Sequence, residues 1–144
     1  MGFCCMLRKE VLTWIEYAKN DIKLAIREME YLRNPRLRPY EIILHHCHQC
    51  AEKMLKAYIL SSGGVPAQIH VLNKLRRTCS SYDNSFSGKR IIDHCVYLDT
   101  FWNIKYPDFT VSADASHATR GIKSAKRIFD FVSEKLGLGK VFFE

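Results

Sequence analysis

The sequence predicts an all-α fold, an up-and-down bundle of four long helices plus one short helix. Two observations predict it. Apolar residues recur every three or four positions over long stretches, as one face of a helix requires, and no stretch alternates apolar and polar residues as a half-buried strand would. The 144 residues, 47% of them hydrophobic, suffice for one buried core and are too few for two. We therefore expect a single domain over residues 1–144.

Breakers bound the five expected helices. A proline disfavours helical backbone in the residue before it, so the first helix should end ahead of Pro35. Glycine is the usual residue just beyond a helix, and Gly63 and Gly137 follow the second and the last helix. The expected helices cover residues 11–33, 40–60, 70–79, 88–102 and 113–136.

The composition and the first residues of the sequence bear on the cellular location of the protein. The longest apolar runs are far shorter than the roughly 20 residues of a membrane span. Residues 1–7 are apolar but lack the basic leader of an export signal. Six cysteines without a framework spacing indicate reduced thiols. We expect a soluble cytoplasmic protein that does not contact membranes.

The charge balance favours an anionic partner. Lys and Arg number 22 against 15 Asp and Glu, which gives a formal net charge of +7. Arg120, Lys123 and Arg127 are three and four residues apart in the last helix and therefore share a face. Lys89 and Arg90 lie at the start of the preceding helix. Binding of phosphates by such a face releases counterions, so the sequence favours a phosphate-bearing ligand.

The second helix contains the densest group of reactive side chains, namely His45, His46, Cys47, His48 and Cys50. His46 and Cys50 share a helix face and could reach one ion. A structural zinc site needs four ligands, and no paired spacing elsewhere supplies the other two. We therefore predict no metal site, with both cysteines in the core and the histidines at its edge.

Three segments resemble those of one family. Residues 46–57, HCHQCAEKMLKA, resemble the signature helix of HEPN domains, whose pattern is close to H-x-x-Q-x-A-E-K-x-L-K-A. Residues 65–75 are similar to the family's proline-containing loop followed by H-x-L-x-x-L, and residues 105–108, KYPD, are similar to its R-Y-P-D box. The three segments follow in the family's order, and the resemblance spans about residues 8–136.

The resemblance implies an up-and-down helical bundle, often a dimer, that binds or acts on nucleotides or RNA without a cofactor. Many members are toxins of prokaryotic toxin–antitoxin pairs, with small nucleotidyltransferases as partners. A groove for the ligand would be formed by His46, Gln49, Glu52, Lys53, Lys56, Lys105, Tyr106 and Asp108. The alternative is that residues 49–56 form a solvated strip in which Glu52 and Lys56 stabilise the helix.

Catalysis is less well supported than binding. The resemblance implies what a ribonuclease of this family would need: an Arg followed, after four to six residues, by a His. Here Lys105 replaces the Arg, and eleven residues separate it from His117. Lysine lacks the bidentate guanidinium that holds a phosphate. A metal-independent ribonuclease with a diverged site remains an alternative, with His46, His48 or His117 as acid and base, and a purely structural dimerisation module is a second alternative.

Overall fold

The computed structural model describes residues 7–31, 40–102 and 112–144, and the regular structure within them is entirely helical. The all-α prediction is confirmed, and each expected helix has a counterpart. The elements are α1 (Lys9–Tyr31), α2 (Tyr40–Ser61), α3 (Leu72–Tyr82), the 3-10 turn η1 (Asn84–Ser87), α4 (Lys89–Asp99) and α5 (Ala115–Lys135). Among the described residues, no helix combines the length and the apolar character that a membrane crossing requires.

α4 is shorter than predicted. It has 11 residues, as α3 does, so the described part of the bundle has three long and two short helices. The cause lies in the hydrogen bonds at its end. The N–H groups of Phe101 and Trp102 bond to carbonyls three residues back, at Leu98 and Asp99, over 3.1 Å each. This tighter spacing belongs to turns and ends the α-helix.

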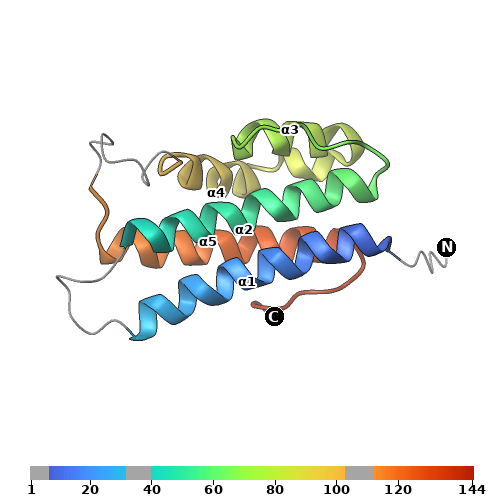
Figure 1. The fold of residues 1–144 in the computed structure, drawn as a ribbon. Helices are drawn as coiled ribbons and strands as arrows, with labels where there is room; N and C mark the ends of the chain where they lie inside the picture. Colours follow the sequence, from blue (N-terminus) through green and yellow to red (C-terminus); the bar gives the residue numbers. More distant parts are fainter. Residues whose placement is uncertain (1–6, 32–39, 103–111) are drawn as a thin grey trace.

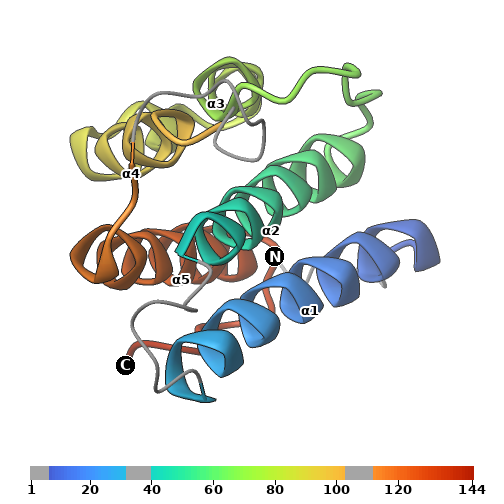
Figure 2. The same ribbon diagram turned by 60° about the vertical axis from the view of Figure 1, so that its left-hand side comes forward.

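α2 is the central element of the bundle and packs against α1, α3, α4 and α5. α1 runs antiparallel to α2, whereas α5 runs in the same direction as α2 (Figure 1). α3 and α4 lie on the side of α2 and α5 opposite α1, as both ribbon views show (Figure 2). The chain thus returns through α3 and α4 before α5 begins.

The core takes apolar side chains from every α-helix. Cys47 and Cys50 are fully buried within it, which confirms their prediction as core residues. Burial raises the pKa of both thiols well above the ordinary range. A thiol that stays protonated is a poor nucleophile and metal ligand, so the structure gives these two cysteines a packing role.

Two glycines fix local geometry that a side chain would disturb. Gly121 of α5 faces α2, and a Cβ atom there would lie 2.5 Å from Leu44 Cδ2. The absence of a side chain lets α2 and α5 approach closely. Gly63 has φ +88° just beyond α2, where its N–H donates to the Leu60 carbonyl over 3.1 Å. Glycine adopts this left-handed conformation without strain and ends the helix as predicted.

Candidate functional site

A buried carboxylate of α1 joins two side chains of α2. His46 Nδ1 donates to Asp21 Oδ1 over 2.8 Å, and Lys53 donates to the other oxygen of the same carboxylate. Burial by itself would raise the pKa of Asp21, but the hydrogen bonds from His46 and Lys53 outweigh burial and lower that pKa. Asp21 is therefore ionised at neutral pH and neutralises Lys53, one of the cations predicted to bind a ligand.

A second carboxylate, Glu52, connects α2 with the loop before α3. Lys56 Nζ donates to Glu52 Oε2 over 3.2 Å, and His70 Nδ1 donates to Glu52 Oε1 over 3.0 Å. Glu52 and Lys56 are only 5% and 7% exposed, so the alternative is wrong about a solvated strip, whereas the pairing of these two residues along the helix is confirmed. The bond between Glu52 and His70 joins the first two segments that resemble HEPN domains.

His48 lies deeper than predicted. It is 1% exposed, so the expectation of a position at the core edge is wrong for this histidine. Its Nε2 donates to Asp99 Oδ1 over 3.2 Å, whereas its buried Nδ1 has no hydrogen-bond partner in the described part of the chain. The rings of His48 and His70 both contact Trp102, at centroid distances of 5.3 and 4.8 Å. Trp102 thus links α2 to the loop before α3.

Asp99 also caps α3 from a distance. Its carboxylate accepts from the backbone N–H groups of Leu72 (2.8 Å) and Asn73 (3.0 Å). These groups open α3, and the N-cap residue Val71 makes no side-chain cap bond. Asp99 replaces the local cap that this helix lacks. We use the name α2 network for Asp21, His46, His48, Glu52, Lys53, Lys56, His70 and Asp99.

The other predicted site residues lie elsewhere or outside the described residues. Gln49 is half-buried on α2. His117 takes part in a capping box at the start of α5: its Nδ1 accepts from the Asp114 backbone N–H, and its own N–H donates to the Asp114 carboxylate. The third segment, with Lys105, Tyr106 and Asp108, lies outside the described residues. A ligand role for the predicted groove of His46, Gln49, Glu52, Lys53, Lys56 and residues 105–108 stays a prediction.

Within residues 7–31, 40–102 and 112–144, no group of three or more His, Cys, Asp or Glu side chains is arranged to hold a metal ion. The α2 network instead pairs each lysine with a carboxylate of its own. An anionic ligand at this position would have to displace Asp21 or Glu52 from its lysine. The arrangement therefore stabilises the junction of α1, α2 and α3 as it stands.

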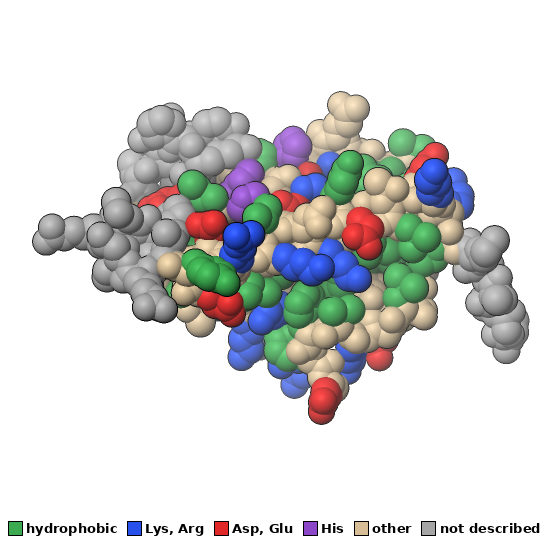
Figure 3. All heavy atoms as spheres, turned by 60° about the horizontal axis from the view of Figure 1, so that its bottom comes forward, with side chains coloured by type: hydrophobic (Ala, Val, Ile, Leu, Met, Phe, Trp, Pro, Cys, Tyr) green, Lys and Arg blue, Asp and Glu red, His purple; other side chains and the backbone are tan. Residues whose placement is uncertain are grey.

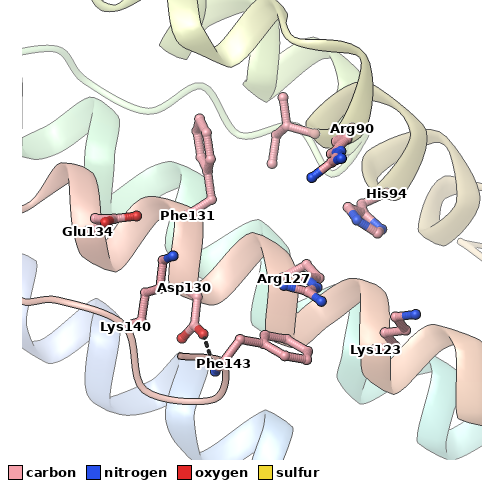
Figure 4. Close-up of a pocket in the computed structure, with 10 residues that line it drawn as sticks. Arg90, His94, Lys123, Arg127, Asp130, Phe131, Glu134, Lys140 and Phe143 are labelled. Carbon is pink, nitrogen blue, oxygen red and sulfur yellow. Dashed lines mark hydrogen bonds between the residues drawn. The ribbon is translucent and has the colours of Figure 1, made fainter.

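A basic cleft lies between α4 and α5. It consists of two cavities of about 430 and 390 Å³ that share Arg90, His94 and Lys123. Figure 4 shows Arg90 and His94 on α4 across the cleft from Lys123 and Arg127 on α5. The cations of the cleft are Arg90, Arg120, Lys123, Arg127 and Lys140. None of them forms an ion pair with a carboxylate of the described residues.

Acidic side chains only partly offset this charge. The cavity walls include three carboxylates, those of Asp93, Asp130 and Glu134. Asp130 is occupied by backbone N–H groups of residues 141–143 and pairs with no cation of the described residues. On the face that includes α1, by contrast, basic side chains are interspersed with acidic and hydrophobic ones (Figure 3). The cleft between α4 and α5 therefore concentrates positive charge.

His94 lies among the cations of the cleft. Its Nδ1 shares a hydrogen bond with Ser124 Oγ of α5 over 3.0 Å. Desolvation lowers the pKa of His94, and the nearby charges of Arg127, Lys123 and Arg120 lower it further, against the opposing effect of Asp93. His94 is therefore neutral at pH 7, and an anion in the cleft would favour its protonation.

The sequence identified this surface only in part. Arg120, Lys123 and Arg127 lie exposed on one face of α5, as predicted from their spacing. His94 was missed, although its distance of four residues from Arg90 places both on one face of α4. Lys140 could not be assigned, because only the folding of the chain beyond α5 brings it to the cleft.

Comparison with known proteins supports the fold. The structure resembles TT1696 from Thermus thermophilus, with a TM-score of 0.72, 23% identity, and coverage of 87% of this chain and 97% of the other. It also resembles ST0689, described as an archaeal HEPN homologue, with a TM-score of 0.66, 22% identity, and coverage of 88% and 97%. No curated protein matches the sequence.

Family membership rests on the sequence. The family model for the HEPN domain matches residues 11–136, which extend from α1 to the end of α5. This match includes both segments joined by Glu52 and His70 and the whole of α4 and α5, which form the basic cleft. The chain therefore belongs to the HEPN domain family.

Proposed function

We propose that this HEPN domain binds the phosphate groups of RNA, or of a nucleotide, in the cleft between α4 and α5. The observation that carries the proposal is the set of five cations in one cleft, none with a carboxylate ion pair in the described residues. Arg and Lys side chains without a carboxylate partner can form charge-assisted hydrogen bonds with phosphate oxygens, and the ring contacts of Arg120 with Tyr97 and of Arg127 with Phe143 do not use their N–H groups. The cavity volume of about 430 Å³ falls in the range of small-ligand sites.

The family resemblance supports finer proposals about context. The protein would work in the cytoplasm as a homodimer, with a small nucleotidyltransferase as its partner in a toxin–antitoxin pair. The predicted groove of His46, Gln49, Glu52, Lys53 and Lys56, together with residues 105–108, is the second candidate for a ligand or partner site, because Glu52 and His70 bring two of the three resembling segments into contact. A diverged ribonuclease remains the enzymatic alternative.

Neutralising the cleft should weaken RNA binding. We expect wild-type protein to bind a labelled single-stranded RNA in fluorescence anisotropy, with an affinity that falls as salt rises from about 50 to 200 mM. Lys123→Gln with Arg127→Gln should lower this affinity by about 30-fold or more, because each of the two charge-assisted bonds contributes about 1 to 2 kcal/mol.

The control removes the same charge elsewhere. Lys9→Gln with Lys23→Gln alters two exposed lysines of α1 and should change the affinity less than about threefold. Equal losses in both double variants, or no binding by wild type, would contradict the proposal. A gel of the same RNA incubated in EDTA reports on the ribonuclease alternative, since metal-independent cleavage persists in chelator.

Binding should also tighten as pH falls. A phosphodiester beside His94 raises the lowered pKa of this side chain, so binding takes up a proton between the free and the bound pKa. Affinity for RNA should therefore rise as pH falls from about 8 to 6, by up to about tenfold for each unit of pKa change. His94→Gln should abolish this dependence, whereas His70→Gln, outside the cleft, should keep it.

A further inference from the structure

The chain beyond α5 is bound to a buried carboxylate at the edge of the cleft. Asp130 is 3% exposed and accepts from three consecutive backbone N–H groups: Val141 at 2.7 Å, Phe142 at 3.0 Å to each oxygen, and Phe143 at 2.7 Å. Gly137 and Gly139 adopt positive φ angles of 78° and 75°, which let the chain reverse. We call residues 138–143 the tail.

Aromatic side chains hold the tail on α5. The Phe142 ring meets Phe129 edge to face, at a centroid distance of 5.3 Å. The Phe143 ring lies over the Arg127 guanidinium, 3.6 Å from centroid to Cζ. Such a contact restricts the guanidinium while leaving its N–H groups available. Figure 4 shows the Arg127 side chain next to the Phe143 ring, with the bond to Asp130 on their left.

The tail contributes to the cleft without filling it. Lys140 and Phe143 line the larger cavity, which measures about 430 Å³ with the tail in place. The tail also satisfies Asp130, and this carboxylate forms no ion pair with Arg127 or Lys123. The docked tail thus adds a cation to the cleft and occupies a carboxylate of its wall.

We propose that the tail is a functional wall of the phosphate site: Asp130 anchors it, Lys140 contacts a phosphate, and Phe143 positions Arg127 for another. This inference rests on the proposed function and names residues that complete it. Because coupling between two binding events is reciprocal, RNA should stabilise the docked tail as much as the docked tail strengthens RNA binding. A tail that merely covered the cleft would have the opposite effect.

The test combines affinity with hydrogen exchange on the full chain, with the single-stranded RNA as the probe. Phe143→Ala leaves the net charge unchanged and should weaken binding about three- to tenfold. Lys140→Gln should reduce the slope of log affinity against log salt by about 0.7, the loss of one phosphate contact. Saturating RNA should slow exchange of the amides of Val141, Phe142 and Phe143 in the wild type.

Val141→Ala is the matched control, because it retains the N–H group bonded to Asp130 and truncates a side chain that is 52% exposed. It should bind RNA as the wild type does. Unchanged RNA affinity in Phe143→Ala together with unchanged amide exchange would overturn the proposed role of the tail and leave the proposed function of the cleft standing. Tighter RNA binding by Phe143→Ala would show that the tail blocks the cleft and does not contribute to the phosphate site. Absence of RNA binding by the wild type would instead refute the proposed function.

Discussion

Asp99→Ala should lower the free energy of unfolding by about 3 kcal/mol, with a fall in Tm of about 10 °C. The substitution removes the acceptor for the N–H groups of Leu72 and Asn73, which open α3 without a local cap. It also leaves the buried His48 ring without its hydrogen bond, although Nδ1 of that ring already lacks a partner in the described residues. Denaturant unfolding followed by circular dichroism measures the change.

Asp93→Ala is the matched control for this experiment. Asp93 is an exposed carboxylate on the same helix. Its replacement by Ala should change the free energy of unfolding by less than about 0.5 kcal/mol. Asp99→Asn keeps one acceptor oxygen and should lower the free energy of unfolding by about half as much as Asp99→Ala does. Equal stabilities of Asp99→Ala and Asp93→Ala would show that α3 does not depend on the distant cap.

Asp21→Ala should lower the free energy of unfolding by about 2 kcal/mol. Removing one member of a fully buried ion pair costs about 3 to 5 kcal/mol. Here the Lys53 and His46 side chains are 21% and 26% exposed and can turn toward water once the carboxylate is lost. The effect should therefore be smaller than for full burial. Urea titration at pH 7 measures it, and Glu16→Ala, an exposed position on the same helix, should change stability little.

The pH dependence identifies the carboxylate as the cause. Since the folded-state pKa of Asp21 lies below its ordinary value of 3.8, its stabilising effect is present above that value and is lost as pH falls through the folded pKa. The difference between wild type and Asp21→Ala should therefore shrink in this acidic window. A constant difference between pH 7 and pH 2 would point to lost packing instead.

The two polar regions of the molecule differ in how their charges are balanced. In the α2 network, Lys53 and Lys56 each have a carboxylate partner. In the cleft between α4 and α5, Asp130 is held by backbone N–H groups, and the five cations have no ion pair with the described residues. A phosphate can therefore enter the cleft without breaking an existing pair.

Helical periodicity was sufficient to predict most of the fold. The regular spacing of apolar residues predicts α1, α2 and α5 to within about two residues at each end. It overestimates α4, because the turn that ends this helix depends on three-residue hydrogen bonds without a proline or glycine signal. The spacing of Arg120, Lys123 and Arg127 likewise predicts their shared face, since position on a helix follows directly from residue number.

The sequence by itself determined the family, the helices and which cations share one helix face, because these depend on residues close together in the chain. Apart from the pair of Glu52 and Lys56 within α2, only the tertiary structure decided which charges are neutralised. Lys53 meets Asp21 across 32 positions, and His70 meets Glu52 across 18. Arg90 and Lys140, 50 positions apart, line the same cavity. Electrostatic energy falls with the distance between charges in space, and sequence separation does not reveal that distance. The cleft between α4 and α5 could therefore be identified only from the packed helices.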